Sequence, residues 1–226
     1  MTTGLRIHNV SMFYDEGRNR ISILDKISLT VKPGEFIAVV GPSGSGKSTF
    51  LSVAGALLKS SEGEITLNGH PFSTLSDSEL SSIRLKEIGF ILQSSNLVPY
   101  LNVLDQLLVI KKMSGKIKAE DKAYAIKLLE DLGLREKLNS FPEELSGGEK
   151  QRTAIARALM GKPSVILADE PTASLDTPRA HEVVNLIANQ VKTRGIAAVM
   201  VTHDERMLDY CDKVYHMEDG KLLLAE

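Results

Sequence analysis

The glycine-rich string GPSGSGKST at residues 41–49 limits the fold of this chain more than any other stretch. It follows the apolar run FIAVV (36–40), which predicts a buried strand, and precedes TFLSVAGALL (49–58), whose apolar spacing predicts a helix. The string matches the pattern G-x-x-x-x-G-K-[ST] in full. A strand, a curled phosphate-binding loop and a helix are therefore expected in direct succession.

The chemistry of such a loop gives each part of the string a role. Glycines allow the backbone to curl so that its N–H groups face phosphate oxygens, and the N-terminus of the following helix attracts anions. Lys47 should reach the β- and γ-phosphates of a nucleoside triphosphate, and the Ser48 hydroxyl should bind Mg²⁺. The residues expected to contact the nucleotide are Gly41, Pro42, Ser43, Gly44, Ser45, Gly46, Lys47, Ser48 and Thr49. The alternative is a chance glycine loop before a helix.

The composition is that of a folded protein without a general affinity for polyanions. Hydrophobic residues make up 42% of the chain and charged residues 25%, which is ordinary for a globular protein. The 27 basic and 29 acidic residues create no global positive field, so nucleic acid is not an expected partner. One cysteine, no secretory segment and no apolar run of about 18 residues predict a cytoplasmic chain without a membrane span of its own.

Strand and helix patterns predict one domain built around a largely parallel sheet. Residues 1–93 and 161–226 read as strands alternating with turns and helices, and EGEITLNGH (62–70) reads as a hairpin. Residues 94–160 carry helical patterns such as AYAIKLLEDLGL. We predict an α/β fold over residues 1–226, in which an N-terminal antiparallel β subdomain and an inserted α-helical subdomain accompany the nucleotide-binding core.

An acidic signal ends the buried-strand pattern SVILADEP (164–171). Asp169 and Glu170 would both reach the phosphate site if this strand neighbours the one before the glycine loop. Asp169 would then hold Mg²⁺, directly or through water, and Glu170 could polarise the attacking water as a general base. A strand that ends in a solvated acidic turn is the alternative.

The string LSGGEKQR (145–152) resembles the signature motif of ABC-type ATPases. Physically, Ser146, Gly147 and Gly148 would open a helix beginning near Glu149, which makes a second anion-binding helix N-terminus. A simple helix N-cap is the alternative. The resemblance implies a P-loop NTPase core of the RecA-like type. It also implies a head-to-tail dimer, in which each ATP lies between the phosphate loop of one subunit and the signature residues of the other.

Four further residues match elements of this family in order and spacing. Gln93 resembles the Q-loop glutamine, which contacts Mg²⁺ and the attacking water, and His203 resembles the switch histidine, which hydrogen-bonds the γ-phosphate. Asp176 resembles the D-loop aspartate at the dimer interface, and Tyr14 resembles the aromatic residue that stacks on adenine. Taken singly, each could be a solvated or structural residue.

Departures from the family pattern are minor. Glu149 stands where glutamine is usual, and the D-loop reads ASLD (173–176) rather than SALD. Neither change removes a group needed for phosphate contact or proton transfer, so the resemblance implies an active ATPase that uses ATP and Mg²⁺. The catalytic groups that it implies are Lys47, Gln93, Glu170 and His203, and the metal-binding groups are Ser48, Gln93 and Asp169.

The sequence of the loops resembles one branch of the family. The block IGFILQSSNLVPYLNVLDQL (88–107) resembles ATPase subunits of the MacB and LolD type, and FILQSSNLVPYL with LADEPTASLD is similar to those of bacterial haem exporters. This implies a motor subunit at the cytoplasmic face of the membrane that drives export or extraction of a hydrophobic or amphiphilic substrate, with haem as the narrowest expectation.

The same resemblance implies a separate membrane permease as partner. Residues 94–105 would form part of the groove that receives the permease, unless their apolar side chains pack within the helical insert. The alternative function is that of a soluble ABC ATPase, or of one that signals through a permease-like partner without moving cargo.

Overall fold

A six-stranded sheet at the centre of the molecule carries the phosphate loop and the acidic pair. The computed structural model describes residues 4–17 and 19–225. The strands of this sheet are β3 (Phe36–Val40), β6 (Ile88–Ile91), β7 (Val165–Asp169), β8 (Ala197–Val201), β9 (Lys213–Glu218) and β10 (Lys221–Leu224). Their order is β10-β9-β3-β8-β7-β6, and all neighbours pair in parallel except β10, which is antiparallel to β9.

A separate antiparallel sheet lies beside the first. Its strands, in the order β2-β1-β4-β5, are β2 (Asn19–Val31), β1 (Leu5–Glu16), β4 (Glu62–Leu67) and β5 (His70–Pro71). The predicted hairpin over 62–70 is confirmed, because Leu67 pairs with His70 across a turn in which Asn68 and Gly69 have φ of 51° and 83°. Positive φ at both central residues is the geometry that matches the twist of a two-residue hairpin.

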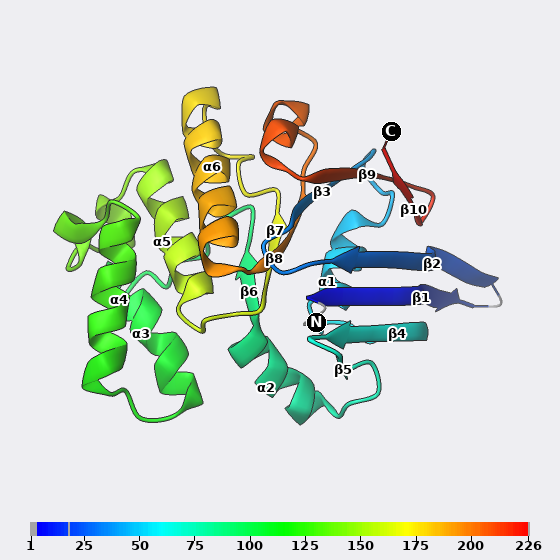
Figure 1. Ribbon diagram of the computed structural model, residues 1–226, viewed down its shortest axis with the longest axis horizontal. Helices are drawn as coiled ribbons and strands as arrows, with labels where there is room; N and C mark the ends of the chain where they lie inside the picture. The colour runs from blue at the N-terminus through cyan, green and yellow to red at the C-terminus, as the bar shows by residue number, and fades with distance from the viewer. Residues whose placement is uncertain (1–3, 18, 226) are drawn as a thin grey trace.

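Within residues 4–17 and 19–225, six α-helices pack around the central sheet. They are α1 (Lys47–Ala54), α2 (Asp77–Glu87), α3 (Val103–Ser114), α4 (Ala119–Asp131), α5 (Gly147–Leu159) and α6 (Thr177–Arg194), with short 3₁₀ helices η1 (Arg135–Lys137), η2 (Pro142–Glu144) and η3 (Glu205–Tyr210). Figure 1 shows α3, α4 and α5 together at one end of the molecule, with α6 between them and the sheet. The antiparallel sheet lies at the opposite end.

The two faces of the central sheet belong to two hydrophobic clusters. Along β7, for example, Val165 and Leu167 join one cluster, whereas Ile166 and Ala168 join the other. This alternation follows from the two-residue period of a strand. The first cluster fills the space between the two sheets together with α1, and the second joins the sheet to the helices α3 to α6.

One local prediction is wrong, and one helix was missed. The helix predicted over 49–58 ends at Ala54, where Gly55 leaves no room for a side chain beside the ring of Phe90, and Ala56 adopts a φ of 58°. Helix α2 was not predicted, although Ser76 and Glu79 form a capping box that marks its start. The predicted fold class is confirmed, whereas the predicted division into residues 1–93, 94–160 and 161–226 stays a prediction.

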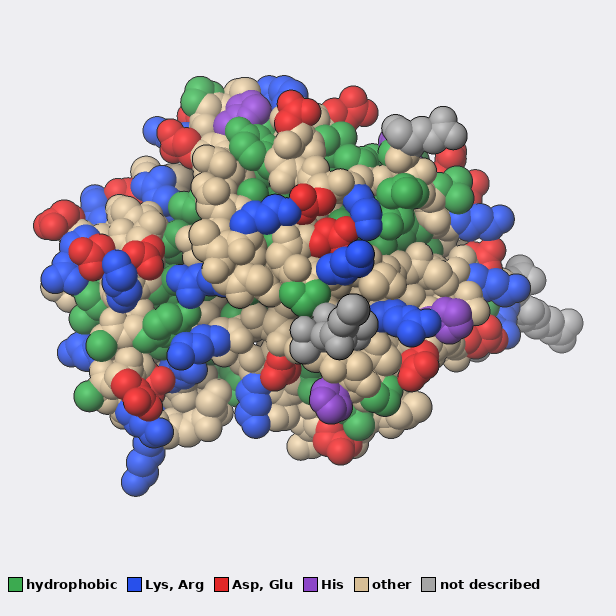
Figure 2. Space-filling view, viewed as in Figure 1, with side chains coloured by type: hydrophobic (Ala, Val, Ile, Leu, Met, Phe, Trp, Pro, Cys, Tyr) green, Lys and Arg blue, Asp and Glu red, His purple; other side chains and the backbone are tan. Residues whose placement is uncertain are grey.

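The surface carries both signs of charge. Figure 2 shows acidic and basic side chains interspersed over the visible face, which is consistent with the near balance of charges in the sequence. Cys211 is partly buried, and burial with the charge of Asp212 raises the pKa of its thiol to about 12, so the thiol stays protonated. No helix in the described part of the chain is long and apolar enough to cross a membrane.

Candidate functional site

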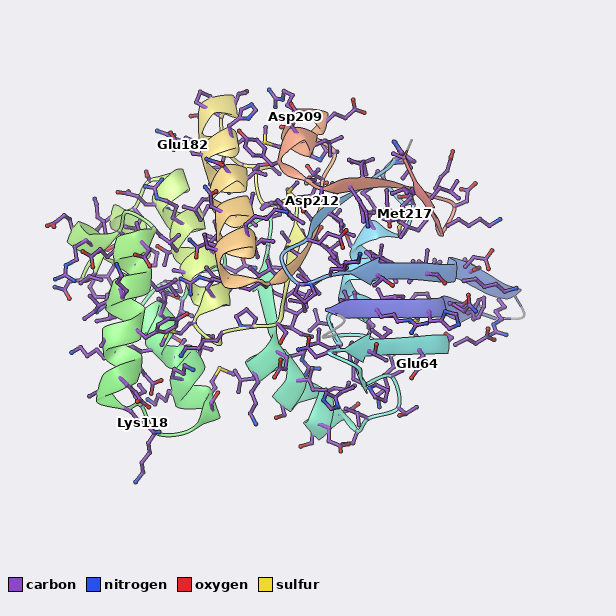
Figure 3. All side chains as sticks on the ribbon, in the orientation of Figure 1. Glu64, Lys118, Glu182, Asp209, Asp212 and Met217 are labelled. Carbon is purple, nitrogen blue, oxygen red and sulfur yellow. The ribbon has the colours of Figure 1, made fainter. Side chains whose placement is uncertain are left out.

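The phosphate loop between β3 and α1 is a tight curl that requires glycine at two positions. Gly41 and Gly46 have φ of 151° and 103°, in a region that other residues rarely adopt. A Cβ on Gly41 would lie 2.1 Å from the carbonyl oxygen of Met217 on β9, labelled in Figure 3, and one on Gly46 would lie 2.8 Å from that of Ile23 on β2. The loop is therefore packed tightly between β9 of the central sheet and β2 of the antiparallel sheet.

Lys47, the first residue of α1, holds the curl from within. Its Nζ donates to the carbonyl oxygens of Gly41 and Pro42, both at 2.7 Å. The described first turn of α1 carries no acidic side chain, and no side chain caps its free N–H groups. These N–H groups and the lysine charge are available to an anion such as a phosphate.

A cavity of ≈ 450 Å³ opens over this loop, which is within the range of small-molecule sites. The residues that line it are Ile23, Gly41, Ser43, Gly44, Gly46, Lys47, Ser48, Thr49, Asp169, Glu170, Val201 and His203. The acidic pair thus reaches the phosphate loop, although β7 does not neighbour β3 as the prediction supposed. Strand β8 lies between them, and the carboxyl ends of all three strands meet at one edge of the sheet.

The acidic pair sits in a strained and partly buried turn. Glu170 has a φ of 47°, and its backbone N–H donates to the carbonyl of Val201 at 2.9 Å. Its carboxylate Oε2 contacts His203 Nδ1 at 2.8 Å and accepts from the backbone N–H of His203 at 3.3 Å. Burial raises the pKa of Asp169, the charge of Glu170 raises it further, and Lys47 lowers it. Strain of this kind is concentrated at functional sites.

The same groups fit a divalent cation. The Ser48 hydroxyl and the carboxylates of Asp169 and Glu170 line one cavity, and the mutual repulsion of the two carboxylates would be relieved by a positive ion. The described residues contain no group of three or more His, Cys, Asp or Glu side chains placed to hold a metal. Mg²⁺ usually takes several of its ligands from water and substrate phosphates and only one or two from carboxylates.

Gln93 and Tyr14 are not among the residues that line this cavity. Gln93 is exposed two residues after the end of β6, at the edge of the sheet. Tyr14 is 46% exposed on β1, and it is Ile23, on the neighbouring strand β2, that lines the cavity. Ile23 was not among the residues predicted for the site; it reaches the cavity because β2 starts at Asn19 and passes beside the phosphate loop.

The signature residues start a helix, as predicted, but that helix begins two residues earlier than Glu149. Ser146 is the N-cap of α5, and its Oγ accepts from the backbone N–H of Glu149 at 3.3 Å. Asp176 likewise caps α6 by accepting from the backbone N–H of Arg179 at 3.1 Å. Neither cap lines the cavity, and Figure 1 shows α5 and α1 on opposite sides of α6.

Comparison with protein families decides the kinship of the chain. A model of the family described as "ABC transporter" matches residues 24–173, which is more than half of the chain. The chain belongs to the ABC transporter family.

This ABC chain is 47% identical over 221 residues to HrtA of Staphylococcus saprophyticus, covering 98% of the chain and 99% of that protein. It is 44% identical over 218 residues to HrtA of Staphylococcus aureus, covering 96% and 98%. Both relatives are assigned by name to hemin import as ATP-binding proteins.

Solved ABC structures agree with the fold. The dimeric cassette MJ0796 bound to ADP and Pi superimposes with a TM-score of 0.84 at 37% identity, covering 96% of each chain. CbiO1 of Clostridium perfringens, part of the transporter complex cbiONQ, gives 0.86 at 27% identity, covering 99% of this chain and 88% of that one. The protein is thus an ABC ATPase, the ATP-binding motor subunit of an ABC transporter, as the sequence predicted.

The tight packing of the phosphate loop against β9 and β2 predicts unequal effects for two of its glycines. Gly41→Ala and Gly44→Ala both place a side chain at positive φ, but a Cβ on Gly44 would meet nothing within 4 Å. We expect Gly44→Ala to lower the free energy of unfolding by about 1–2 kcal/mol, which is the cost of the backbone conformation. Gly41→Ala should cost more and abolish ATP binding, because it must displace β9. Denaturant unfolding measures the loss of stability, and nucleotide titration measures the loss of ATP affinity. Equal losses in Gly41→Ala and Gly44→Ala would contradict the close packing of Gly41 against β9.

Proposed function

We propose that two copies of this chain bind ATP head to tail. Each ATP would lie between the phosphate loop of one copy and residues 146–149 of the other. The observation that carries this proposal is that one chain holds two helix N-termini suited to phosphate. The N-terminus of α1 has no side-chain cap, that of α5 is capped by Ser146, and the two helices lie on opposite sides of α6. The dimeric state of the solved cassette MJ0796 supports it.

Within the shared site, Glu170 acts as the general base. Its carboxylate is mostly buried, with 17% of the side chain exposed, and His203 holds it at the edge of the cavity. Water oxygen attacks the γ-phosphorus while its proton passes to Glu170, and cleavage of the bond to the bridging oxygen releases ADP and phosphate. The His203 ring is 69% exposed beside this carboxylate, and we propose that it hydrogen-bonds the γ-phosphate. Bound by Ser48, Asp169 and Gln93, Mg²⁺ would neutralise charge on the phosphates.

Residues 94–105 are proposed as the docking site for a membrane permease, which would hold the protein at the cytoplasmic face of the membrane. Tyr100 is 79% exposed, whereas Leu97 packs against the helical core. The fully buried side chain of Gln106 fixes this loop by bonding to the backbone N–H and carbonyl of Val98, at 3.1 and 2.7 Å. A firmly held loop that presents an aromatic side chain is typical of an interface centre.

The role of Glu170 predicts loss of turnover without loss of ATP. Glu170→Gln should lower steady-state phosphate release by about 10²- to 10⁴-fold, the usual contribution of a general base. Equilibrium binding of ATP should persist, because the phosphate loop is untouched. The matched control Glu182→Gln changes an exposed carboxylate on α6 (Figure 3) and should leave the rate unchanged. Turnover of Glu170→Gln within twofold of wild type would refute the assignment.

The shared site predicts that a bulky cation at the start of α5 blocks association. Ser146→Arg should prevent ATP-dependent dimers in a Glu170→Gln background, while nucleotide binding by the monomer is retained. Light scattering with and without ATP measures the association. Ser114→Arg, at the exposed end of α3, is the matched control. Dimers that form equally well in both variants would count against the head-to-tail site.

Haem is the cargo that we propose for the transporter. The support is the name of the two HrtA relatives, which span almost the whole chain, together with the sequence resemblance of residues 88–107. The resemblance of FILQSSNLVPYL and LADEPTASLD to haem exporters favours export, whereas the relatives' names specify import. The two directions of transport predict different phenotypes for a strain that lacks this protein.

A deletion strain tests both the cargo and its direction. If the protein drives export, growth of the deletion strain should be inhibited at haem concentrations that the parent tolerates. Re-expression of the wild-type chain, but not of Glu170→Gln, should restore tolerance. Loss of growth on haem as the iron source, with unchanged tolerance, would indicate import instead. A deletion strain that matches its parent in both assays would reject haem as the cargo.

A further inference from the structure

The N-terminus of α5 carries a carboxylate where an anion is proposed to bind. Glu149 Oε2 accepts from the backbone N–H of Ser146 at 2.8 Å, while the backbone N–H of Glu149 donates to Ser146 Oγ at 3.3 Å. This reciprocal capping box fixes the Ser146 side chain at the start of the helix. In the proposed dimer, the γ-phosphate of the other copy would lie at this end of the helix.

Such a carboxylate works against phosphate binding unless it is neutralised. The helix dipole supplies only about half of a positive charge at its N-terminus, less than the full negative charge of an ionised Glu149. The backbone bond from Ser146 lowers the pKa of Glu149, so the charge is present at neutral pH. The Glu149 carboxylate therefore orients Ser146, but its negative charge repels the γ-phosphate that Ser146 would contact.

Lys137 lies where it can cancel that repulsion. Its Nζ is 3.4 Å from Glu149 Oε1, and the Glu149 side chain is only 19% exposed, so the pair is less screened than a fully exposed one. Lys137 ends the 3₁₀ helix η1, whose position is fixed by the fully buried side chain of Leu134 and by Leu138, which packs against the helical core. The lysine is thus held beside the cap by an element outside the signature motif.

We propose that Lys137 is a positioning residue for the shared ATP site. By pairing with Glu149 it lets the carboxylate cap Ser146 without repelling the γ-phosphate, so the start of α5 stays attractive to anions. This inference rests on the proposed head-to-tail dimer. It assigns a function to a residue that no sequence motif contains.

A double-mutant cycle in the Glu170→Gln background tests the proposal. The measured quantity is the ATP concentration that gives half-maximal dimerisation by light scattering. Lys137→Met should raise it by about two- to fivefold, the size expected for one charge near a helix terminus. In a Glu149→Gln chain, whose amide oxygen can still accept from Ser146, Lys137→Met should change it less than about twofold. The effect should shrink at high ionic strength.

Two controls separate charge from structure. Lys137→Arg should behave as the parent, because it keeps the positive charge. Arg135→Met removes a charge from the same 3₁₀ helix, where Arg135 makes no ion pair within the described residues, and should also have no effect. An equal effect of Lys137→Met in both backgrounds, or none in either, overturns the proposal. Failure of the parent chain to dimerise with ATP would instead reject the shared site itself.

Discussion

The curl of the phosphate loop is the constraint on which the rest of the site depends. Lys47 ties the loop to its own first two carbonyls, and the loop backbone also touches carbonyl oxygens of β9 and β2. Because β9 and β2 belong to different sheets, the loop can take this shape only when both sheets are in place. The antiparallel sheet is therefore a wall of the nucleotide site, since its Ile23 lines the cavity.

Much of the site followed from the sequence because its determinants are local. A glycine loop between a buried strand and a helix, and a carboxylate pair that ends a buried strand, are patterns of adjacent residues whose backbone needs are specific. The order of strands is not local. Strand β8 separates β3 from β7, and only the packing of α6 and the pairing of residues far apart in the chain decide that order. Ile23 was missed for a related reason, because most of β2 lacks a recognisable strand pattern and is held by its partner β1.

Several residues predicted from sequence motifs do not line the cavity of their own chain. Ser146 and Asp176 are both helix N-caps whose side chains are already engaged with their own helices, and Gln93 follows an edge strand. In a single chain the two caps have a structural role that can be understood without a ligand. Sequence patterns identified them, but their position in one copy gives them no contact with the phosphate loop of that copy. In the proposed dimer, Ser146 and Asp176 would lie at the phosphate loop of the other copy.

The contact of the phosphate loop with β9 joins residues 41–49 to a strand near the C-terminal end of the sequence. Met217 closes against Gly41, and the N–H of Gly220, in the turn after β9, donates to the carbonyl of Ser45 at 3.2 Å. A fragment cut after His203 would keep every side chain assigned to phosphate or proton transfer, yet its loop would lose this backing. Removal of β9 and the residues after it would thus take away the support of the phosphate loop while sparing the motifs. The minimal unit of nucleotide binding is set by backbone support as much as by the residues that touch phosphate.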